Sequence, residues 1–544
     1  MGATSPHLSP QTIGPAYLAD LDRAERRRAG AFYTPAGLAA GLVRLALGDA
    51  PAGVRVCDPA VGAGAFLLAA ADLLAAAGLG RRRIVEELLW GVDLDPGAVD
   101  VCRRALVAWA AEGGEVAEPR HVVVGDGLAG LESWPDAPAA GFDAVVGNPP
   151  FQSQLGRATA RDAVRAANLR TRFGEILTPY VDTAALFLVA ATRAVAPGGR
   201  VVLVLPESVL SARDAGPARA AALSSCHMAG FWWAGAHLFD ALVDVCAPVL
   251  ERGGHPSRVV SRWKGAEVEP AAPATLDADE APRGGSWGSL LAPEDGPAGP
   301  RLEGAGVLGD LARATAGFRD QFYGIAAHVR EAATRVAAPA GDRRARLVTS
   351  GLVDPLHLRW GAAPSRFAGR RWDAPEVDLA SLEAADPRLA RWGHERLVPK
   401  VLLATQTRVL EPVVDVDGSW WPSVPTIAVV PTGSAGPDDL WAIAAVLAAP
   451  PVSAWALDRH RGTALGRDAV KLAATQVLDL PLPGDRTGWA RGAAAARDAQ
   501  HAATGGDAAR WRRALVELGR AMTEAYDATP AIFEWWRDRL PPWR

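Results

Sequence analysis

The first 150 residues contain short apolar runs that each end abruptly at a polar side chain. These runs have the length of buried strands and occupy residues 54–57, 88–92, 121–124 and 142–146. The side chains that end them are those of Asp58, Asp93, Asp126 and Asn148. Any one of these is an ordinary turn residue, but a parallel sheet would place all four along its carboxyl edge, where α/β proteins bind ligands. The pattern therefore predicts an α/β sheet with a ligand site at that edge.

Helical patterns separate these runs. Leucines recur at helical spacing after Thr34 and Pro35, which predicts a helix with a hydroxyl cap and a proline at its first position. A turn containing Gly62 and Gly64 opens the next predicted helix, directly after the first run. Residues 182–198 predict a further helix, and strand candidates follow at 200–208, 231–234 and 243–250. Seven strands with intervening helices predict a Rossmann-like α/β domain.

The fourth run ends in an unusual turn, Asn148-Pro149-Pro150-Phe151. Consecutive prolines fix the backbone and remove two N–H donors, so the carbonyls of Asn148 and Pro149 are available to accept hydrogen bonds from a ligand. An exocyclic amino group suits such acceptors. By itself the sequence is compatible with a simple turn, and its position as the fourth strand end at one sheet edge is what favours a binding site.

The glycine-rich turn after the first run constrains the cofactor. It has neither the GxGxxG pattern of dinucleotide sites nor the GxxxxGK[ST] pattern of triphosphate sites. An acidic side chain at the end of the second run is well placed for ribose hydroxyls. These features favour a nucleoside cofactor without phosphates, and S-adenosylmethionine is such a cofactor.

Composition divides the chain into segments. Residues 1–29 form a polar N-terminal extension, and residues 30–262 hold the predicted Rossmann-like domain. Residues 263–304 are rich in proline, glycine, alanine and acids, which predicts a linker. A second domain of α+β type is expected at 305–485, followed by a helical C-terminal segment at 486–544.

Charge and cysteine content narrow the function classes. The formal net charge is −4, so bulk attraction to nucleic acid is not expected, although a local basic face remains open. The four cysteines form no CxxC pair, and neither a disulfide framework nor a metal site is expected. The N-terminus lacks the apolar core of a signal peptide, and no run is long enough for a membrane span. A cytoplasmic protein is expected.

The second domain contains one mildly basic segment. Between Asp342 and Arg408 there are twelve Arg or Lys against eight Asp or Glu, with tryptophans interleaved. A phosphate-contacting face needs such a composition, although most segments of this kind are solvated surface. The candidate DNA contacts are Arg370, Arg371, Lys400 and Arg408.

The motifs GAFYTP, DPAVGAGAF, GVDLDP, GDG, GNPPF and LFDALVDVCAPVL occur in this order over residues 25–255. This set resembles the N6-adenine DNA methyltransferases of the gamma arrangement, which include methylases of restriction–modification and phage-defence systems. The resemblance implies an S-adenosylmethionine-dependent enzyme that acts on double-stranded DNA, with a C-terminal target-recognition domain and a location in the nucleoid. The residues before Asp58 are too few for a fused nuclease domain, and the rest of the sequence has no convincing nuclease cluster, so any restriction endonuclease or defence subunit is expected to be a separate protein.

The resemblance assigns roles to individual residues. Tyr33, Thr34 and Pro35 would hold the methionine end of the cofactor. The cofactor cradle would comprise Asp58, Ala60, Gly62 and Gly64. Asp93 would bind the ribose, Leu94 and Phe187 would enclose the adenine, and Asp126 would accept from its amino group. At the next position this chain has Gly127, where the family often has a bulky residue.

For the target base, the resemblance assigns hydrogen bonding to Asn148 and Pro149 and stacking to Phe151, with Phe239 on the opposite face. Phe239 is equally compatible with a core position at a strand edge. Two alternatives remain open. One is an RNA or protein (glutamine) amino-group methyltransferase on the same fold, since Asn-Pro-Pro with an aromatic residue also occurs there. The other is a non-catalytic DNA-binding subunit that retains the fold.

Overall fold

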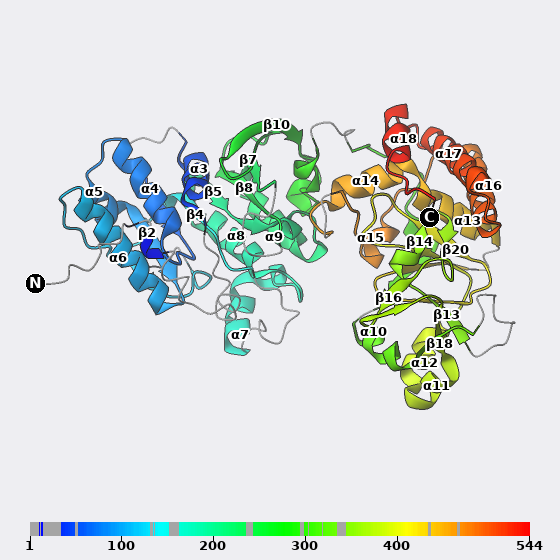
Figure 1. The fold of residues 1–544 in the computed structure, drawn as a ribbon. Helices are drawn as coiled ribbons and strands as arrows, with labels where there is room; N and C mark the ends of the chain where they lie inside the picture. The colour runs from blue at the N-terminus through cyan, green and yellow to red at the C-terminus, as the bar shows by residue number, and fades with distance from the viewer. Residues whose placement is uncertain are drawn as a thin grey trace, which may run out of the picture. The chain divides into compact units, whose positions relative to one another are not determined.

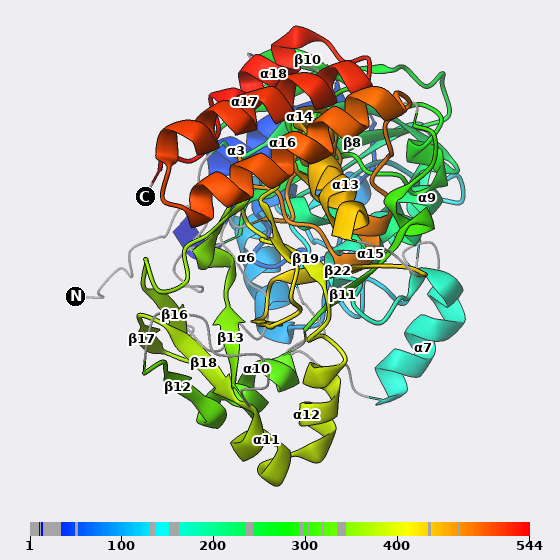
Figure 2. The ribbon, with the colours of Figure 1, turned by 90° about the vertical axis from the view of Figure 1, so that its right-hand side faces the viewer.

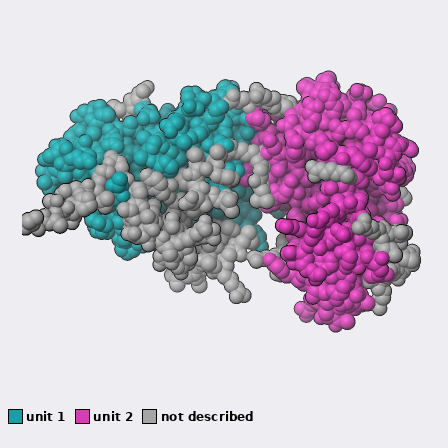
Figure 3. Space-filling view, viewed as in Figure 1, with its two compact units in different colours: residues 1–292 teal, residues 293–544 magenta. Residues whose placement is uncertain are grey.

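The computed structural model places the chain in two compact units, residues 1–292 and 293–544, which are described separately (Figure 3). The description covers residues 10, 12–14, 34–48, 53–130, 134, 136–151, 163–235, 243–293, 299–302, 304–317, 319–333, 344–433, 437–464 and 468–543. Tyr33 and Phe239 lie outside the described residues, as does most of the N-terminal extension.

The first unit is built around one mixed sheet with the strand order β10-β9-β7-β8-β5-β4-β1-β2-β3, and β6 pairs with β8 (Figure 1). Its strands are β1 (Val56–Asp58), β2 (Leu89–Asp93), β3 (Val122–Val124), β4 (Phe142–Gly147), β5 (Val195–Leu203), β6 (Leu205–Pro206), β7 (Cys226–Trp233), β8 (Val245–Arg252), β9 (Val259–Lys264) and β10 (Glu269–Thr275). Its α-helices are α3 (Ala36–Leu47), α4 (Ala65–Ala76), α5 (Arg81–Arg83), α6 (Pro96–Glu112), α7 (Ala163–Phe173), α8 (Thr183–Ala194) and α9 (Gly216–Leu223).

Helices cover both faces of this sheet, and alternation along the strands divides the core accordingly. Ala144 and Val146 of β4 pack with α3, α4 and α6, while Val145 between them packs on the opposite face with α8. Alternation of this kind arises because successive side chains of a strand point to opposite faces. The α/β class predicted from the apolar runs is confirmed.

The pairing also confirms that the predicted strand ends share one edge. β1 is parallel to β2 on one side and to β4 on the other, and β2 is parallel to β3. Parallel strands have their carboxyl ends at the same edge, so Asp58, Asp93, Asp126 and Asn148 all follow strands that end there. The order reverses between β1 and β4, where a ligand crevice is expected in such sheets.

The segment expected to be a linker differs from that expectation. Strand β10 lies inside it and pairs antiparallel with β9 at the end of the sheet, and Trp287 is fully buried in the core. Pro270 and Pro273 lie in β10, and an edge strand is the place where a sheet tolerates proline. Proline content predicted a linker here because composition alone does not distinguish a linker from an edge strand.

The second unit is α+β. Two four-stranded sheets have the orders β11-β22-β19-β20 and β12-β18-β13-β21, with two short hairpins beside them. The strands are β11 (Ala312–Ala316), β12 (Val329–Glu331), β13 (Arg344–Val348), β14 (Val353–Asp354), β15 (His357–Leu358), β16 (Ser365–Phe367), β17 (Arg370–Trp372), β18 (Pro375–Asp378), β19 (Lys400–Leu403), β20 (Pro412–Asp415), β21 (Trp420–Pro422) and β22 (Ile427–Pro431).

Helices pack on both sheets of this unit. They are α10 (Arg319–Ile325), α11 (Leu379–Ala385), α12 (Pro387–His394), α13 (Pro437–Ala448), α14 (Pro450–His460), α15 (Ala474–Leu478), α16 (Arg486–Thr504), α17 (Ala508–Ala525) and α18 (Pro530–Arg537). Helices α16 and α17 lie side by side (Figure 2) and share one core with the β11-β22-β19-β20 sheet. The helical character predicted for the C-terminal segment is confirmed.

Candidate functional site

The amide of Asn148 lies at the end of β4 and contacts the segment before α3. Its Nδ2 donates a hydrogen bond to Oγ1 of Thr34 over 3.2 Å, and Thr34 is buried. The predicted hydroxyl cap is wrong: Pro35 is the N-cap residue of α3, and no side chain caps this helix. The Thr34 hydroxyl binds the amide instead, which joins two motifs that lie 114 residues apart.

Asp58 lies against Gly147, the residue before Asn148. A Cβ atom on Gly147 would lie 2.5 Å from Oδ1 of Asp58, so only glycine fits before the amide. Oδ1 of Asp58 accepts a hydrogen bond from the backbone N–H of Ala60 at 3.0 Å. Burial and, to a smaller extent, the negative charge of Asp93 raise the pKa of Asp58 to about 8. From the sequence, Gly147 was expected only to be part of the strand. A glycine at a strand end can, however, indicate that another group lies close to the backbone.

The glycine-rich turn is tied to the ends of the neighbouring strands. Oδ2 of Asp93 accepts a hydrogen bond from Gly62 N–H at 2.9 Å, and the Asp93 carbonyl accepts one from Gly125 N–H at 2.8 Å. Gly62 has a φ of +49°, and no atom lies within 4 Å of where its Cβ would be. Burial raises the pKa of Asp93. The turn thus presents open space on one side, at Gly62, and the half-buried carboxylate of Asp93 on the other.

Gly64 has a structural role in this turn. It is the N-cap residue of α4, with a φ of +90°, and a Cβ there would lie 2.8 Å from Sγ of Cys102 in α6. A larger residue would push α4 and α6 apart.

The two apolar residues expected to enclose an adenine differ in exposure. Leu94 follows the end of β2 and is 54% exposed, whereas Phe187 of α8 is 4% exposed. Gly127 follows β3, and its Cβ would lie 2.0 Å from the Pro59 carbonyl oxygen and 2.9 Å from the Phe187 ring. Pro59 and Phe187 thus fill the space that a bulky side chain after Asp126 would occupy.

Asp126 and the rest of the Asn148 motif occupy defined positions. Oδ1 of Asp126 accepts a hydrogen bond from Leu128 N–H at 3.0 Å, within the turn after β3. Pro149 is buried, and Pro150 is half-buried. Phe151 is half-buried and packs against the cores on both faces of the sheet.

Three of the four basic candidates of the second unit are exposed, and one is not. Arg370 and Arg371 lie on β17, and Arg408 lies in the turn after β19. Lys400 is fully buried and its Nζ forms an ion pair with Oδ2 of Asp415 at 2.5 Å. The prediction that Lys400 contacts DNA is therefore wrong. It was based on the positive charge of the residue, but the side chain is buried and its charge is paired with that of Asp415.

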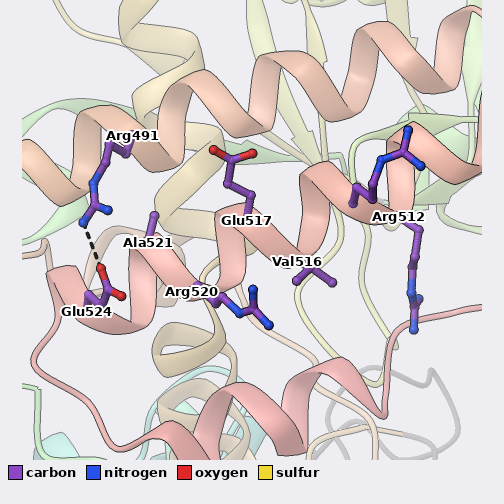
Figure 4. Close-up of a pocket in the computed structure, with 8 residues that line it drawn as sticks. Arg491, Arg512, Val516, Glu517, Arg520, Ala521 and Glu524 are labelled. Carbon is purple, nitrogen blue, oxygen red and sulfur yellow. Dashed lines mark hydrogen bonds and ion pairs between the residues drawn. The ribbon is translucent and has the colours of Figure 1, made fainter.

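An open groove of about 550 Å³ runs along α16 and α17 in the second unit (Figure 4). Its lining includes Arg491, which forms an ion pair with Glu524 at 2.9 Å, and several further charged residues of α17. Charges of both signs alternate along this face, as on an ordinary solvated helix pair. Six of its eight lining residues are charged, and Val516 and Ala521 alone do not form the apolar walls that a nucleoside requires.

The described residues contain no group of three or more His, Cys, Asp or Glu side chains positioned for a metal ion. In the same part of the chain, no single helix has the length and apolar character to cross a membrane. One bent helix pair, Asp438–Ala448 with Pro450–His460, meets that test by length and composition.

Comparison with known proteins gives a family match over the first unit. Residues 11–254 match the family model described as N-6 DNA Methylase. The solved structure of the Type IIL restriction-modification enzyme MmeI in complex with DNA is similar at 13% identity and a TM-score of 0.60, covering 98% of this chain and 82% of that one. A cryo-EM structure of a DrdV–DNA complex has 13% identity and a TM-score of 0.54, covering 91% and 59%. At such identities the likeness shows the fold, and no curated protein matches this chain.

Proposed function

We propose that this chain, whose residues 11–254 match the N-6 DNA Methylase family model, transfers a methyl group from S-adenosylmethionine to N6 of adenine in double-stranded DNA. The observation that carries the proposal is the Asn148 amide, held by Thr34 at the carboxyl edge of the sheet, with Asp58 against the preceding Gly147. Amino-group methylation requires such an acceptor beside a nucleoside site.

The residues at this edge fit S-adenosylmethionine. Two carboxyl groups, the buried Asp58 and the half-buried Asp93, have raised pKa values, and a bound cation would favour their ionised forms. The cofactor carries an ammonium group and a sulfonium centre. It has no phosphates, which agrees with the absence of a phosphate-binding pattern in the glycine turn. Leu94 presents an exposed apolar surface beside Asp93, as expected for one side of an adenine site. When bound, the cofactor supplies the methyl group.

Asn148 and Pro149 would activate the acceptor. The amino group of adenine is a weak nucleophile because its lone pair is delocalised into the ring. Hydrogen bonds from its two N–H groups to Oδ1 of Asn148 and to the Pro149 carbonyl would stabilise the positive charge that develops on nitrogen during transfer. The Thr34 hydroxyl takes the Nδ2 end of the amide, which directs Oδ1 towards the acceptor.

The acceptor base must leave the duplex to reach this edge, because its amino group is otherwise paired. Phe151 is half-buried and follows the two prolines, so its ring is restrained in a position suited to stacking on a flipped base. Phe239 is proposed to cover the opposite face of the base.

The second unit is proposed to recognise the target sequence, with residues 305–485 as the recognition domain and 486–544 as its helical support. The solved structures with the same overall fold include a restriction-modification enzyme bound to DNA, which supports a role in restriction–modification or phage defence. A cleaving subunit would be a separate protein, and Arg370, Arg371 and Arg408 would contact the DNA.

Transfer of tritiated methyl groups from S-adenosylmethionine to unmethylated duplex DNA tests the proposal, with matched RNA and protein acceptors alongside. Asn148→Ala should reduce the rate at least about a hundredfold, the order expected when one interaction with a developing charge is lost. Incorporation that survives this substitution, or that is confined to RNA or protein, would overturn the proposal. Digestion to nucleosides should identify N6-methyladenine as the product.

A further inference from the structure

The short hairpin of β16 and β17 in the second unit carries a concentrated positive charge. Its eight residues, 365–372, include three arginines and no acid. Arg366, Arg370 and Arg371 are all exposed. No ion pair links any of the three to an acid among the described residues, in contrast to Arg491, Arg497 and Arg510 on α16 and α17, each of which pairs with an acid.

The pairing places two of these charges directly opposite each other. Arg366 of β16 is the cross-strand partner of Arg371 of β17. Side chains of directly opposed residues lie on the same face of a hairpin at close range, and like charges there destabilise the pair. The free protein thus maintains a repulsive contact on an exposed face.

The other face of the hairpin is fixed to the core. Phe367 and Trp372 are buried, and the Phe367 ring lies 4.6 Å from that of Phe322. Trp372 Nε1 donates a hydrogen bond to the Phe367 carbonyl at 3.2 Å, which locks the two strands together. Arg370 lies with its guanidinium carbon 4.6 Å from the centre of the Trp372 ring, so its position is also restrained.

The tip of the hairpin is narrow. Ala368 and Gly369 form the turn, and both have positive φ angles, +49° and +77°. This is the backbone of the tight two-residue turn favoured in hairpins, and neither residue adds bulk. A two-stranded β-ribbon fits the DNA major groove, whose width is about 12 Å.

We propose that this hairpin is a DNA-docking element, in which Arg366 and Arg371 bind backbone phosphates and Arg370 flanks them. Phosphates bound between Arg366 and Arg371 would offset the repulsion between the two guanidinium groups. The buried Phe367 and Trp372 fix the hairpin that carries these groups. The assignment rests on the proposed action on duplex DNA. It adds Arg366, which is not among the DNA contacts predicted from the sequence.

The test compares DNA affinity with the stability of the free protein. Arg366→Gln with Arg371→Gln should weaken binding to duplex DNA about tenfold at moderate salt and lower the slope of log K against log salt by about 2. Arg371→Glu should raise the melting temperature by forming a cross-strand ion pair with Arg366, while it also weakens binding. Arg104→Gln on α6, which removes a paired surface arginine, should leave both quantities unchanged.

Methyl transfer at saturating, low-salt DNA separates this inference from the proposed function. The hairpin variants should retain wild-type rates there, since the Asn148 site is intact. Unchanged affinity and salt slope in the double variant, with wild-type protein active on DNA, would overturn the docking role alone. Failure of wild-type protein to methylate DNA would overturn the proposed function. Stronger loss of binding to RNA than to duplex DNA would also contradict the docking role.

Discussion

Nδ2 of Asn148 donates a hydrogen bond to Oγ1 of Thr34 over 3.2 Å, which fixes one end of the amide at the carboxyl edge of the sheet. An amide has one donor end and one acceptor end, so a partner for the nitrogen decides where the oxygen points. The segment before α3 was expected to hold only the cofactor. The contact makes it a positioning element for the acceptor amide as well.

Thr34→Val should therefore slow methyl transfer at saturating S-adenosylmethionine and DNA. Valine has the shape of threonine without the hydroxyl, and loss of one hydrogen bond corresponds to roughly fivefold to tenfold in rate. Thr34→Ser, which keeps the hydroxyl, should be close to wild type. Single-turnover rates measure the effect separately from product release.

A double-mutant cycle distinguishes this role from direct cofactor binding. If Thr34 acts through Asn148, then Thr34→Val adds no further loss in an Asn148→Ala background. Fully additive losses, together with weaker binding of S-adenosylmethionine in calorimetry, would instead assign Thr34 to the cofactor alone.

Gly127→Ala should destabilise the first unit by about 1–3 kcal/mol, because the new Cβ overlaps the Pro59 carbonyl oxygen and the Phe187 ring. Displacement of Phe187 should also raise the KM for S-adenosylmethionine. Gly37→Ala in α3 is the matched control: no atom lies within 4 Å of its Cβ position, and helix propensity predicts a gain of up to about 1 kcal/mol. Urea denaturation measures both variants. Equal stability of the two would contradict the crowding at Gly127.

Lys400→Ala should destabilise the second unit by about 3–5 kcal/mol, because it leaves the Asp415 carboxylate buried without its cation. Burial lowers the pKa of Lys400 and raises that of Asp415, and the ion pair opposes both shifts. Arg408→Ala, on the exposed turn, should change stability by less than about 0.5 kcal/mol. Thermal melts compare the two, and a larger effect on DNA affinity than on stability for Lys400→Ala would restore its role in binding.

The features that depend on local sequence, the strands and their ends, were predicted correctly. The features that depend on tertiary contacts, such as the partners of Thr34 and Lys400, were not. Apolar runs ending at Asp58, Asp93, Asp126 and Asn148 were sufficient for the parallel sheet and its ligand edge, because strand period and turn chemistry are local. The partner of Thr34 was not predictable, since a hydroxyl before proline is normally a cap and Asn148 lies 114 residues away. Lys400 was misplaced for the same reason: its partner Asp415 belongs to the next strand, and charge counting carries no information on burial.

The proline-rich segment and the hairpin arginines show a second limit. Composition gave a linker at 263–304, whereas prolines at 270 and 273 lie in an edge strand that needs fewer backbone donors. Arg370 and Arg371 stood out as adjacent charges, but Arg366 acquired meaning only from the register that sets it opposite Arg371. Register depends on the turn at Ala368 and Gly369, which lies between the paired residues Phe367 and Arg370 and could have been recognised as a two-residue hairpin turn.

The raised pKa of Asp58 gives the free enzyme a pH dependence whose sign can be stated. The pKa is about 8 in the folded protein and near 3.8 for an unperturbed carboxyl, so the folded state binds more protons between these values. The contribution of the Asp58 carboxyl group to the stability of the folded protein is fully present below about pH 4 and is lost as pH rises through about 8. Stability of the free protein should therefore fall over this window, and Asp58→Asn should flatten the curve.

Cofactor binding provides the matching test. If an ammonium group binds beside Asp58, its positive charge favours the ionised carboxylate, so binding should release a proton near pH 7. Calorimetry of S-adenosylmethionine binding in buffers of different ionisation enthalpy measures this release. Asp58→Asn should abolish the release and weaken binding, yet it should stabilise the free protein at pH 7, because the buried amide carries no charge. Wild-type proton release in the variant would show that another group, such as Asp93, carries the titration.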